Sequence, residues 1–306
     1  MPEPKPITSL QGTASVGGPV TGPVVRVAAV NDEPSPTWDL DQGLDVLEQL
    51  GFGFVELRAA WGQMVDDMED ETFERAASRL HERGFRVTTY LSQMGQCVPH
   101  EANRAAEARR LKRAAERARR LGARQIRLMG YRKGEESDNW NERAVELIHD
   151  LTRIARRAGQ TLIFENPPNA RNAAIGTASE CLQVLRAVNS PHLRLNFDAG
   201  NFGAHGEEAL QAFEMLKGFI VNVHVKDILV LGDPSTYCAA GDGACRYPEI
   251  FAGLASMNFS GIVTAEPHLP RSLGHHASER EGFMHAAQRM VALLQEAGFS
   301  VVKRAE

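Results

Sequence analysis

The stretch Leu193-Arg194-Leu195-Asn196-Phe197-Asp198 alternates apolar and polar residues and ends on a carboxylate. Successive side chains of a β-strand point to opposite faces of the sheet, so this alternation predicts a strand with one apolar and one polar face. Residues 221–226 and 262–266 repeat the pattern. A fold that gathers such strand ends would bring together three residues able to bind a metal ion, namely Asp198, His224 and Glu266.

Along the whole chain, the same patterns predict eight strands that alternate with eight helices. Strict alternation is typical of parallel strands, because each helix supplies the crossover to the next strand. An open doubly wound sheet would need continuously apolar strands, whereas several strands here keep a polar face. No Gly-x-Gly-x-x-Gly motif of a dinucleotide-binding fold follows the first strand. We therefore predict a single (β/α)8 TIM barrel. The predicted strands span residues 24–30, 54–58, 85–91, 125–129, 161–165, 193–198, 219–226 and 261–266, and the helices span 38–50, 70–83, 101–121, 139–158, 177–188, 207–217, 247–257 and 278–297.

The composition is that of an ordinary soluble globular protein: the chain has 306 residues, 43% of them hydrophobic, and a formal net charge of −5. Neither nucleic acid nor a membrane is an expected partner, because the charge is negative and no apolar run approaches the roughly 20 residues that span a bilayer. Residues 1–22 are rich in Pro, Gly, Ser and Thr, which predicts a flexible, disordered tail before a catalytic barrel domain over residues 23–300. The absence of a signal-like N-terminus and of CxxC motifs predicts a cytoplasmic protein with free thiols.

Four side chains that can bind a metal are predicted at one rim of the barrel. The C-terminal ends of all strands meet there, and barrel enzymes place their active sites at that rim. Three carboxylates gathered with an imidazole are costly unless a cation compensates their charge. Taken singly, a strand-end Asp could cap a helix and a strand His could be a core residue, but the joint pattern predicts one divalent metal ion. Oxygen-rich ligation with one His suits Mn²⁺, Mg²⁺ or Co²⁺ and is compatible with Zn²⁺. The four predicted ligands are Glu165, Asp198, His224 and Glu266.

Short motifs around these positions resemble those of a known family. They are Glu165-Asn166, Phe197-Asp198-Ala199-Gly200-Asn201, His224-Val225-Lys226-Asp227, Gly241-Asp242-Gly243 and Glu266-Pro267. They look like the xylose-isomerase-like TIM barrels, and within these the sugar phosphate isomerase/epimerase group, which includes ketose 3-epimerases, hydroxypyruvate isomerase and inosose dehydratase. The resemblance covers roughly residues 24–298.

The resemblance implies an enzyme and a mechanism. It implies that the same four residues bind the metal, and that Glu165 and Glu266 also move protons as the acid/base pair. The activity it implies is a metal-dependent sugar isomerase or epimerase, which transfers a proton next to a carbonyl through a metal-stabilised enediolate. The expected partner is a small sugar or keto-sugar, and exposed barrel helices make a homo-dimer or homo-tetramer the expected assembly.

Other polar residues of the predicted rim are candidates for binding the substrate. Some of them have an alternative interpretation, because Glu56 with Arg58, and Lys226 with Asp227, could form structural ion pairs instead. The candidates are Glu56, Arg58, Gln93, Asn166, Asn201, Lys226, Asp227 and His268.

Two positions depart from the ketose 3-epimerase pattern. Those enzymes carry a His three residues after the metal-binding Asp, where this chain has Asn201, and an Arg shortly after the metal-binding His, where it has Ile228-Leu229-Val230. A different substrate shape is therefore expected. One alternative is a lyase, either a dehydratase or a keto-glycoside deglycosidase, that uses the same enediolate. Another is a sugar-binding barrel without activity, although retention of all four ligand positions favours an enzyme.

Overall fold

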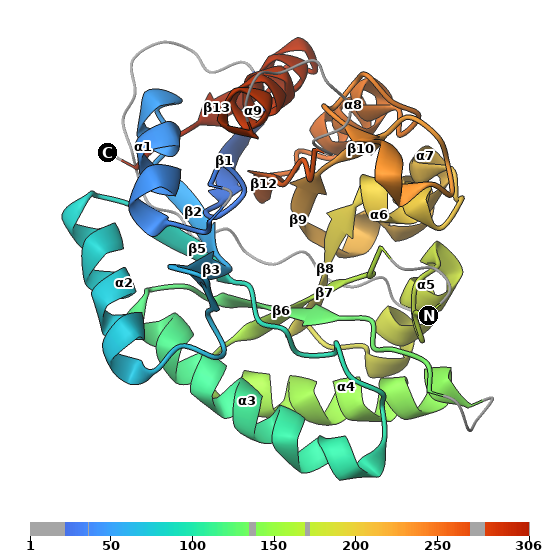
Figure 1. Ribbon diagram of the computed structural model, residues 1–306. Coiled ribbons are helices and arrows are strands. Elements are labelled where there is room, and N and C mark those ends of the chain that lie inside the picture. Colours follow the sequence, from blue (N-terminus) through green and yellow to red (C-terminus); the bar gives the residue numbers. More distant parts are fainter. Residues whose placement is uncertain (1–21, 36, 135–138, 169–171, 270–278, 306) are drawn as a thin grey trace.

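The computed structural model describes residues 22–305 except 36, 135–138, 169–171 and 270–278. The predicted tail over residues 1–22 therefore lies outside the described residues, apart from its last residue. Eight parallel strands close into a barrel, because the last of them pairs with the first, and a ring of helices surrounds it (Figure 1). The prediction of a TIM barrel is confirmed. The strands are β1 (Val24–Val30), β2 (Phe54–Leu57), β5 (Arg86–Tyr90), β6 (Gln125–Met129), β7 (Thr161–Glu165), β8 (Leu193–Asp198), β9 (Ile220–Val225) and β12 (Ile262–Ala265).

Each outer helix buries one apolar stripe against the barrel, as the periodicity of its sequence predicts. In helix α4 (Trp140–Arg157), Leu147, Ile148 and Leu151 face inward and are almost fully buried. A capping box between Thr177 and Glu180 fixes where helix α5 (Ala178–Val188) begins. The outer helices are α1 (Leu40–Gln49), α2 (Asp70–Glu82), α3 (Glu101–Arg120), α4 (Trp140–Arg157), α5 (Ala178–Val188), α7 (Ala209–Leu216), α8 (Tyr247–Ser256) and α9 (Glu279–Glu296).

The structure adds short elements that the sequence analysis did not predict. A ninth strand, β13, pairs in parallel with the first half of β1, at the end of the barrel opposite the rim. Two small hairpins, β3–β4 and β10–β11, lie in the loops after β2 and β9. Among the described residues, no helix is long and apolar enough to cross a membrane. The added elements are β3 (Ala59–Ala60), β4 (Gln63–Met64), α6 (Ala199–Ala204), η1 (Lys217–Phe219), β10 (Asp227–Ile228), η2 (Pro234–Thr236), β11 (Tyr237–Cys238) and β13 (Ser300–Val302).

Helix α6 matters for the site because it starts directly after β8. Asp198 is its N-cap residue, and the side chain accepts a hydrogen bond from the backbone N–H of Asn201. Gly200 lets the helix approach the chain after β9, since a Cβ at this position would lie 2.6 Å from the backbone oxygen of Lys226. The sequence predicts no helix between the strand over residues 193–198 and the helix over residues 207–217. In the structure this segment is a short helix that packs against β9 and β10.

Candidate metal centre

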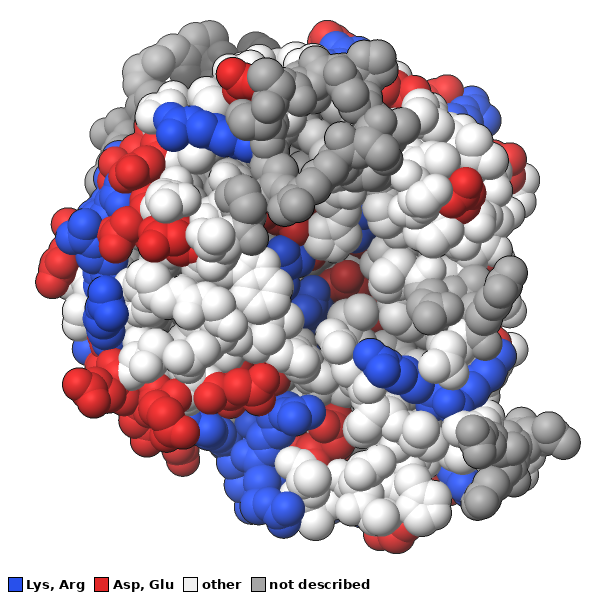
Figure 2. Space-filling view, viewed as in Figure 1, with Lys and Arg blue, Asp and Glu red and all other residues white. Residues whose placement is uncertain are grey.

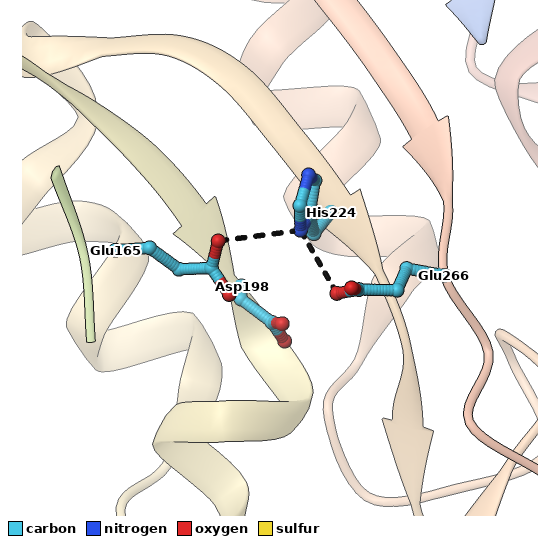
Figure 3. A group of neighbouring side chains, drawn as sticks. All are labelled: Glu165, Asp198, His224 and Glu266. Atoms are coloured by element: carbon cyan, nitrogen blue, oxygen red, sulfur yellow. Dashed lines mark hydrogen bonds and ion pairs between the residues drawn. The ribbon is translucent and has the colours of Figure 1, made fainter. Parts of the chain in front are cut away.

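The four predicted ligands converge at the rim of the barrel (Figure 3). Glu165 and Asp198 end β7 and β8, His224 lies near the end of β9, and Glu266 directly follows β12. Asp198 is the direct neighbour of His224 in the pairing of β8 with β9. One ligand atom from each of the four residues lies within 4.8 Å of the other three, and all four are buried. The structure thus brings these side chains together as the sequence predicts.

His224 lies at the centre of this group. Its Nδ1 is 2.9 Å from Oε2 of Glu266 and 3.5 Å from Oε2 of Glu165. The other ring nitrogen, Nε2, is 2.8 Å from Oε2 of Glu56. Burial lowers the pKa of the imidazole, but the carboxylates of Glu266, Glu56 and Glu165 outweigh it and hold this pKa well above its ordinary value. The nitrogen that faces the other ligand candidates is therefore Nδ1.

Asp198 presents an oxygen that is available to a cation. Its Oδ2 is buried and accepts no hydrogen bond from the described residues, although it forms an ion pair of 2.9 Å with Nζ of Lys226. Burial raises the pKa of Asp198 above its ordinary value despite this ammonium group. Three buried carboxylates and one imidazole are a donor set that fits a divalent ion which prefers oxygen ligands. The residues present therefore fit the metal that the sequence predicts.

The two glutamates of the group have different surroundings. Glu165 is held by neutral amides: Nδ2 of Asn196 donates to Oε2 at 2.8 Å, and Nδ2 of Asn201 donates to Oε1 at 3.3 Å. A guanidinium nitrogen of Arg127 approaches no closer than 3.6 Å. Asn201, at the position where the ketose 3-epimerases carry His, thus contacts a predicted catalytic residue. Hydrogen bonds to both oxygens fix the orientation of the Glu165 carboxylate.

Glu266, in contrast, is surrounded by cationic groups. Arg58 donates to its Oε1 at 2.9 Å, while His224 and Lys226 contact Oε2 at 2.9 and 3.3 Å. Burial raises the pKa of Glu266, but Lys226, His224 and His268 together hold it well below its ordinary value. Glu266 is therefore held as a carboxylate, with one oxygen already engaged by a guanidinium group.

Glu56 and Asp227 were expected to bind substrate, but both are fully buried and have protein partners. Glu56 lies beneath His224 and accepts hydrogen bonds from Asn222 and Thr264 at 2.7 Å. Asp227 organises the loop after β9, because its carboxylate accepts four backbone N–H groups. These belong to Ile228, Gly241, Gly243 and Cys245, at 2.8, 2.9, 3.2 and 3.0 Å.

The two ion pairs considered as alternatives are not the ones observed. Arg58 pairs with Asp32, Glu33 and Glu266 rather than with Glu56. Lys226 pairs with Asp198 and Glu266 rather than with Asp227. Both cations thus point toward the predicted metal ligands, and each connects a different rim loop to Glu266.

The remaining substrate candidates lie at different depths. Asn166 is fully buried, and its Oδ1 has no hydrogen-bond partner among the described residues. Gln93 is partly buried, and its backbone N–H donates to Asp66 at 2.7 Å. The ring of His268 remains one-third exposed, and its Nδ1 is 2.7 Å from Oε1 of Glu33. Figure 2 shows a hollow at the centre of this face, with basic and acidic side chains at its floor.

Three residues of the site were missed by the sequence analysis. Asn196 was noted only as a polar-face residue of its strand, yet it holds Glu165. Asp32 and Glu33 follow β1 and hold Arg58. Their position directly after the first strand was the available signal, because every strand end contributes to the same rim.

Comparisons with known proteins agree with the barrel fold. Over residues 44–300 the chain matches the family model described as xylose isomerase-like TIM barrel. It is 24% identical to a 3-dehydroshikimate dehydratase of Bacillus anthracis over 246 residues, which is 78% of this chain and 83% of that protein. Its fold is similar to that of the IolI protein with a bound zinc atom (TM-score 0.74, 16% identity, 89% of this chain and 98% of the other). It is also similar to that of L-ribulose 3-epimerase (TM-score 0.70, 17% identity, 90% and 96%). The chain therefore belongs to the xylose isomerase-like TIM barrel family.

Proposed function

We propose that this protein is a divalent-metal-dependent enzyme that moves a proton next to the carbonyl of a small sugar-like substrate, as an isomerase or epimerase. The observation that carries the proposal is the buried group of three carboxylates and one imidazole, whose ligand atoms lie within 4.8 Å of one another. Glu165, Asp198, His224 and Glu266 would hold the ion. An ion there supplies positive charge that makes a C–H bond next to a carbonyl more acidic.

In this proposal Glu165 removes the carbon-bound proton. Its carboxylate is oriented by the neutral amides of Asn196 and Asn201, which donate to its two oxygens at 2.8 and 3.3 Å. Glu266 contacts three cationic groups, and its pKa is held well below the ordinary value, which makes it a weak base. Glu266 would return a proton to carbon after taking that proton from the ammonium group of Lys226, which lies 3.3 Å from its Oε2. Asn166, with an unsatisfied buried Oδ1, is a candidate for binding a substrate hydroxyl.

A second candidate function is elimination of water or an aglycone, which makes the protein a lyase. Two observations favour it. The ammonium group of Lys226 lies 3.3 Å from Glu266 and 2.9 Å from Asp198, where it can donate a proton to a leaving oxygen. The Bacillus anthracis relative carries the name of a dehydratase. Elimination needs one base and one acid, and in this candidate Glu165 is the base and Lys226 is the acid.

Incubation in D₂O with Mn²⁺ and a panel of ketoses, inososes and 3-keto-glycosides tests the proposal and separates the two candidates. Deuterium incorporation without loss of a substituent is expected for an isomerase or epimerase. Release of water or an aglycone is expected for a lyase. If protein loaded with Mn²⁺, Mg²⁺ or Co²⁺ neither exchanges deuterium nor releases product, while binding the same sugars in calorimetry, the chain is a binding protein and the proposal is wrong.

Binding of the metal is expected to release about one proton at neutral pH. The carboxylates around His224 hold its pKa well above the ordinary value, so the ring is protonated until an ion requires the neutral form. Because the pKa of His224 is raised, a divalent ion must displace a proton from the ring. At pH values below this pKa, the apparent affinity for the ion should rise about tenfold with each unit of increasing pH. Calorimetric titrations of Mn²⁺ in two buffers of different ionisation enthalpy measure the number of protons. No release at pH 7 would contradict this arrangement.

A further inference from the structure

A second group of potential ligands lies beside the first and shares Glu266 with it. It consists of Glu33, Glu266 and His268, whose ligand atoms also lie within 4.8 Å of one another. Nδ1 of His268 is 2.7 Å from Oε1 of Glu33, and Nε2 is 3.8 Å from Oε1 of Glu266. The two oxygens of Glu266 thus face different groups: Oε2 faces His224, and Oε1 faces His268. This is the arrangement of a carboxylate that could bridge two ions.

The guanidinium group of Arg58 contacts two of the three members of this second group, Glu33 and Glu266. One of its terminal nitrogens donates to Oε1 of Glu266 at 2.9 Å, and the other donates to Oε1 of Glu33 at 2.6 Å. Its Nε lies 3.0 Å from both oxygens of Asp32, so all parts of the fork are used. The side chain of Arg58 is only 14% exposed, and those of Asp32 and Glu33 are 0% and 8% exposed. This is a built cation site on three buried carboxylates rather than a surface ion pair.

The chemistry of arginine explains what such a cation does to Glu266. Guanidinium remains charged at any physiological pH and forms planar, directional hydrogen bonds to carboxylates. Oε1 of Glu266 is therefore permanently engaged, and Oε2, which His224 and Lys226 contact, is the oxygen that would bind an ion held with Asp198 and His224. A metal ion at the second position would have to displace a charged group that compensates three carboxylates.

We propose that Arg58 is a resident cation standing where a second metal ion would bind, so that it keeps the centre mononuclear and makes Glu266 a ligand through Oε2 only. Arg58 is thus a positioning residue, and not the substrate-binding residue expected from its place at the rim. The inference rests on the proposed function, because it presupposes that the first group holds an ion.

Metal stoichiometry tests this inference without reference to activity. Equilibrium dialysis against excess Mn²⁺ followed by elemental analysis is expected to give one ion per chain in the wild type and two in Arg58→Met. Paramagnetic resonance of the variant should show a spin-coupled pair, because a shared carboxylate would bridge the ions. Adding His268→Ala to Arg58→Met should restore one ion, since it removes a ligand of the second position.

Arg83→Met is the matched control. Arg83 also pairs with three carboxylates, namely Asp41, Asp45 and Glu48, but on the outer surface between α1 and α2. That variant should keep one ion. A folded Arg58→Met that binds one ion would overturn the inference while leaving the proposed function intact. If Arg58→Met does not fold, the wild type decides: one ion at excess Mn²⁺ supports the inference, and a spin-coupled pair overturns it. A wild type that binds no divalent ion would instead overturn the proposed function itself.

Discussion

Replacing Glu165 by glutamine is expected to lower kcat by about 10²- to 10⁴-fold, the usual contribution of a general base. The substitution keeps the size of the side chain and its contact with Asn201, but it removes the basic carboxylate that the amides of Asn196 and Asn201 orient. The measurement is deuterium exchange into the substrate under saturating Mn²⁺. Metal content has to be determined on the same samples, because Glu165 is also a proposed ligand.

A matched control is available in Glu180→Gln. Glu180 also accepts hydrogen bonds on a fixed carboxylate, from the backbone N–H groups of Gly176 and Thr177 at 2.9 and 3.0 Å, but in the capping box of α5. This variant should lose some stability and keep kcat. Full activity of metal-loaded Glu165→Gln would rule out the assigned role. Complete loss of the metal in that variant would show that Glu165 acts first as a ligand.

The barrel and the convergence of its four candidate ligands could be predicted from the sequence because both follow from simple periodicities. Alternation with period two places Asp198 on the polar face of β8, and parallel strands bring their C-terminal ends to one rim. Residues able to bind a metal ion at the ends of neighbouring strands then lie close to one another. These features depend on strand order and direction, which the alternation of strands and helices determines.

How deep each polar side chain lies within the barrel could not be predicted from the sequence pattern. Glu56 and Glu165 both lie on polar positions near strand ends, yet Glu56 lies beneath His224 while Glu165 joins the group of candidate ligands. The stagger of neighbouring strands decides which polar residue reaches the rim, and it appears only when the sheet closes. The bulge between Leu195 and Asn196 shifts the register of β8 against β9 and is another such feature.

The short helix α6 was missed for a different reason. Two of its six residues are glycines, Gly200 and Gly203, and glycine lowers intrinsic helix propensity. They are present because the helix packs closely: a Cβ on Gly203 would lie 2.6 Å from a side-chain carbon of Ile228. Tertiary packing therefore overrides local propensity beside the candidate centre, and the sequence resembles a turn there.

Replacing Glu56 by glutamine is expected to weaken Mn²⁺ binding by about 10- to 100-fold, the usual effect of losing a group that orients a metal-binding His. Glu56 is fully buried and contacts Nε2 of His224 at 2.8 Å, which turns Nδ1 toward the other ligand candidates. Burial raises the pKa of Glu56, but His224 and the hydroxyl and amide donors around the carboxylate outweigh burial. The net pKa lies below its ordinary value, so the residue is ionised. Removing this buried charge should also cost about 3–5 kcal/mol of unfolding free energy.

Asp227→Asn separates the effect on the metal from the effect on stability. Asp227 is equally buried and also accepts four hydrogen bonds, but they hold the loop after β9 rather than His224. Urea unfolding should show that both variants are destabilised, whereas calorimetry should show weakened Mn²⁺ binding in Glu56→Gln only. Because both variants lose one buried carboxylate, equal metal affinity in the two would mean that Glu56 stabilises the barrel floor and does not orient His224. Weaker Mn²⁺ binding in Glu56→Gln alone would show that the candidate centre includes Glu56. This residue lies on β2, a strand that contributes none of the four candidate ligands.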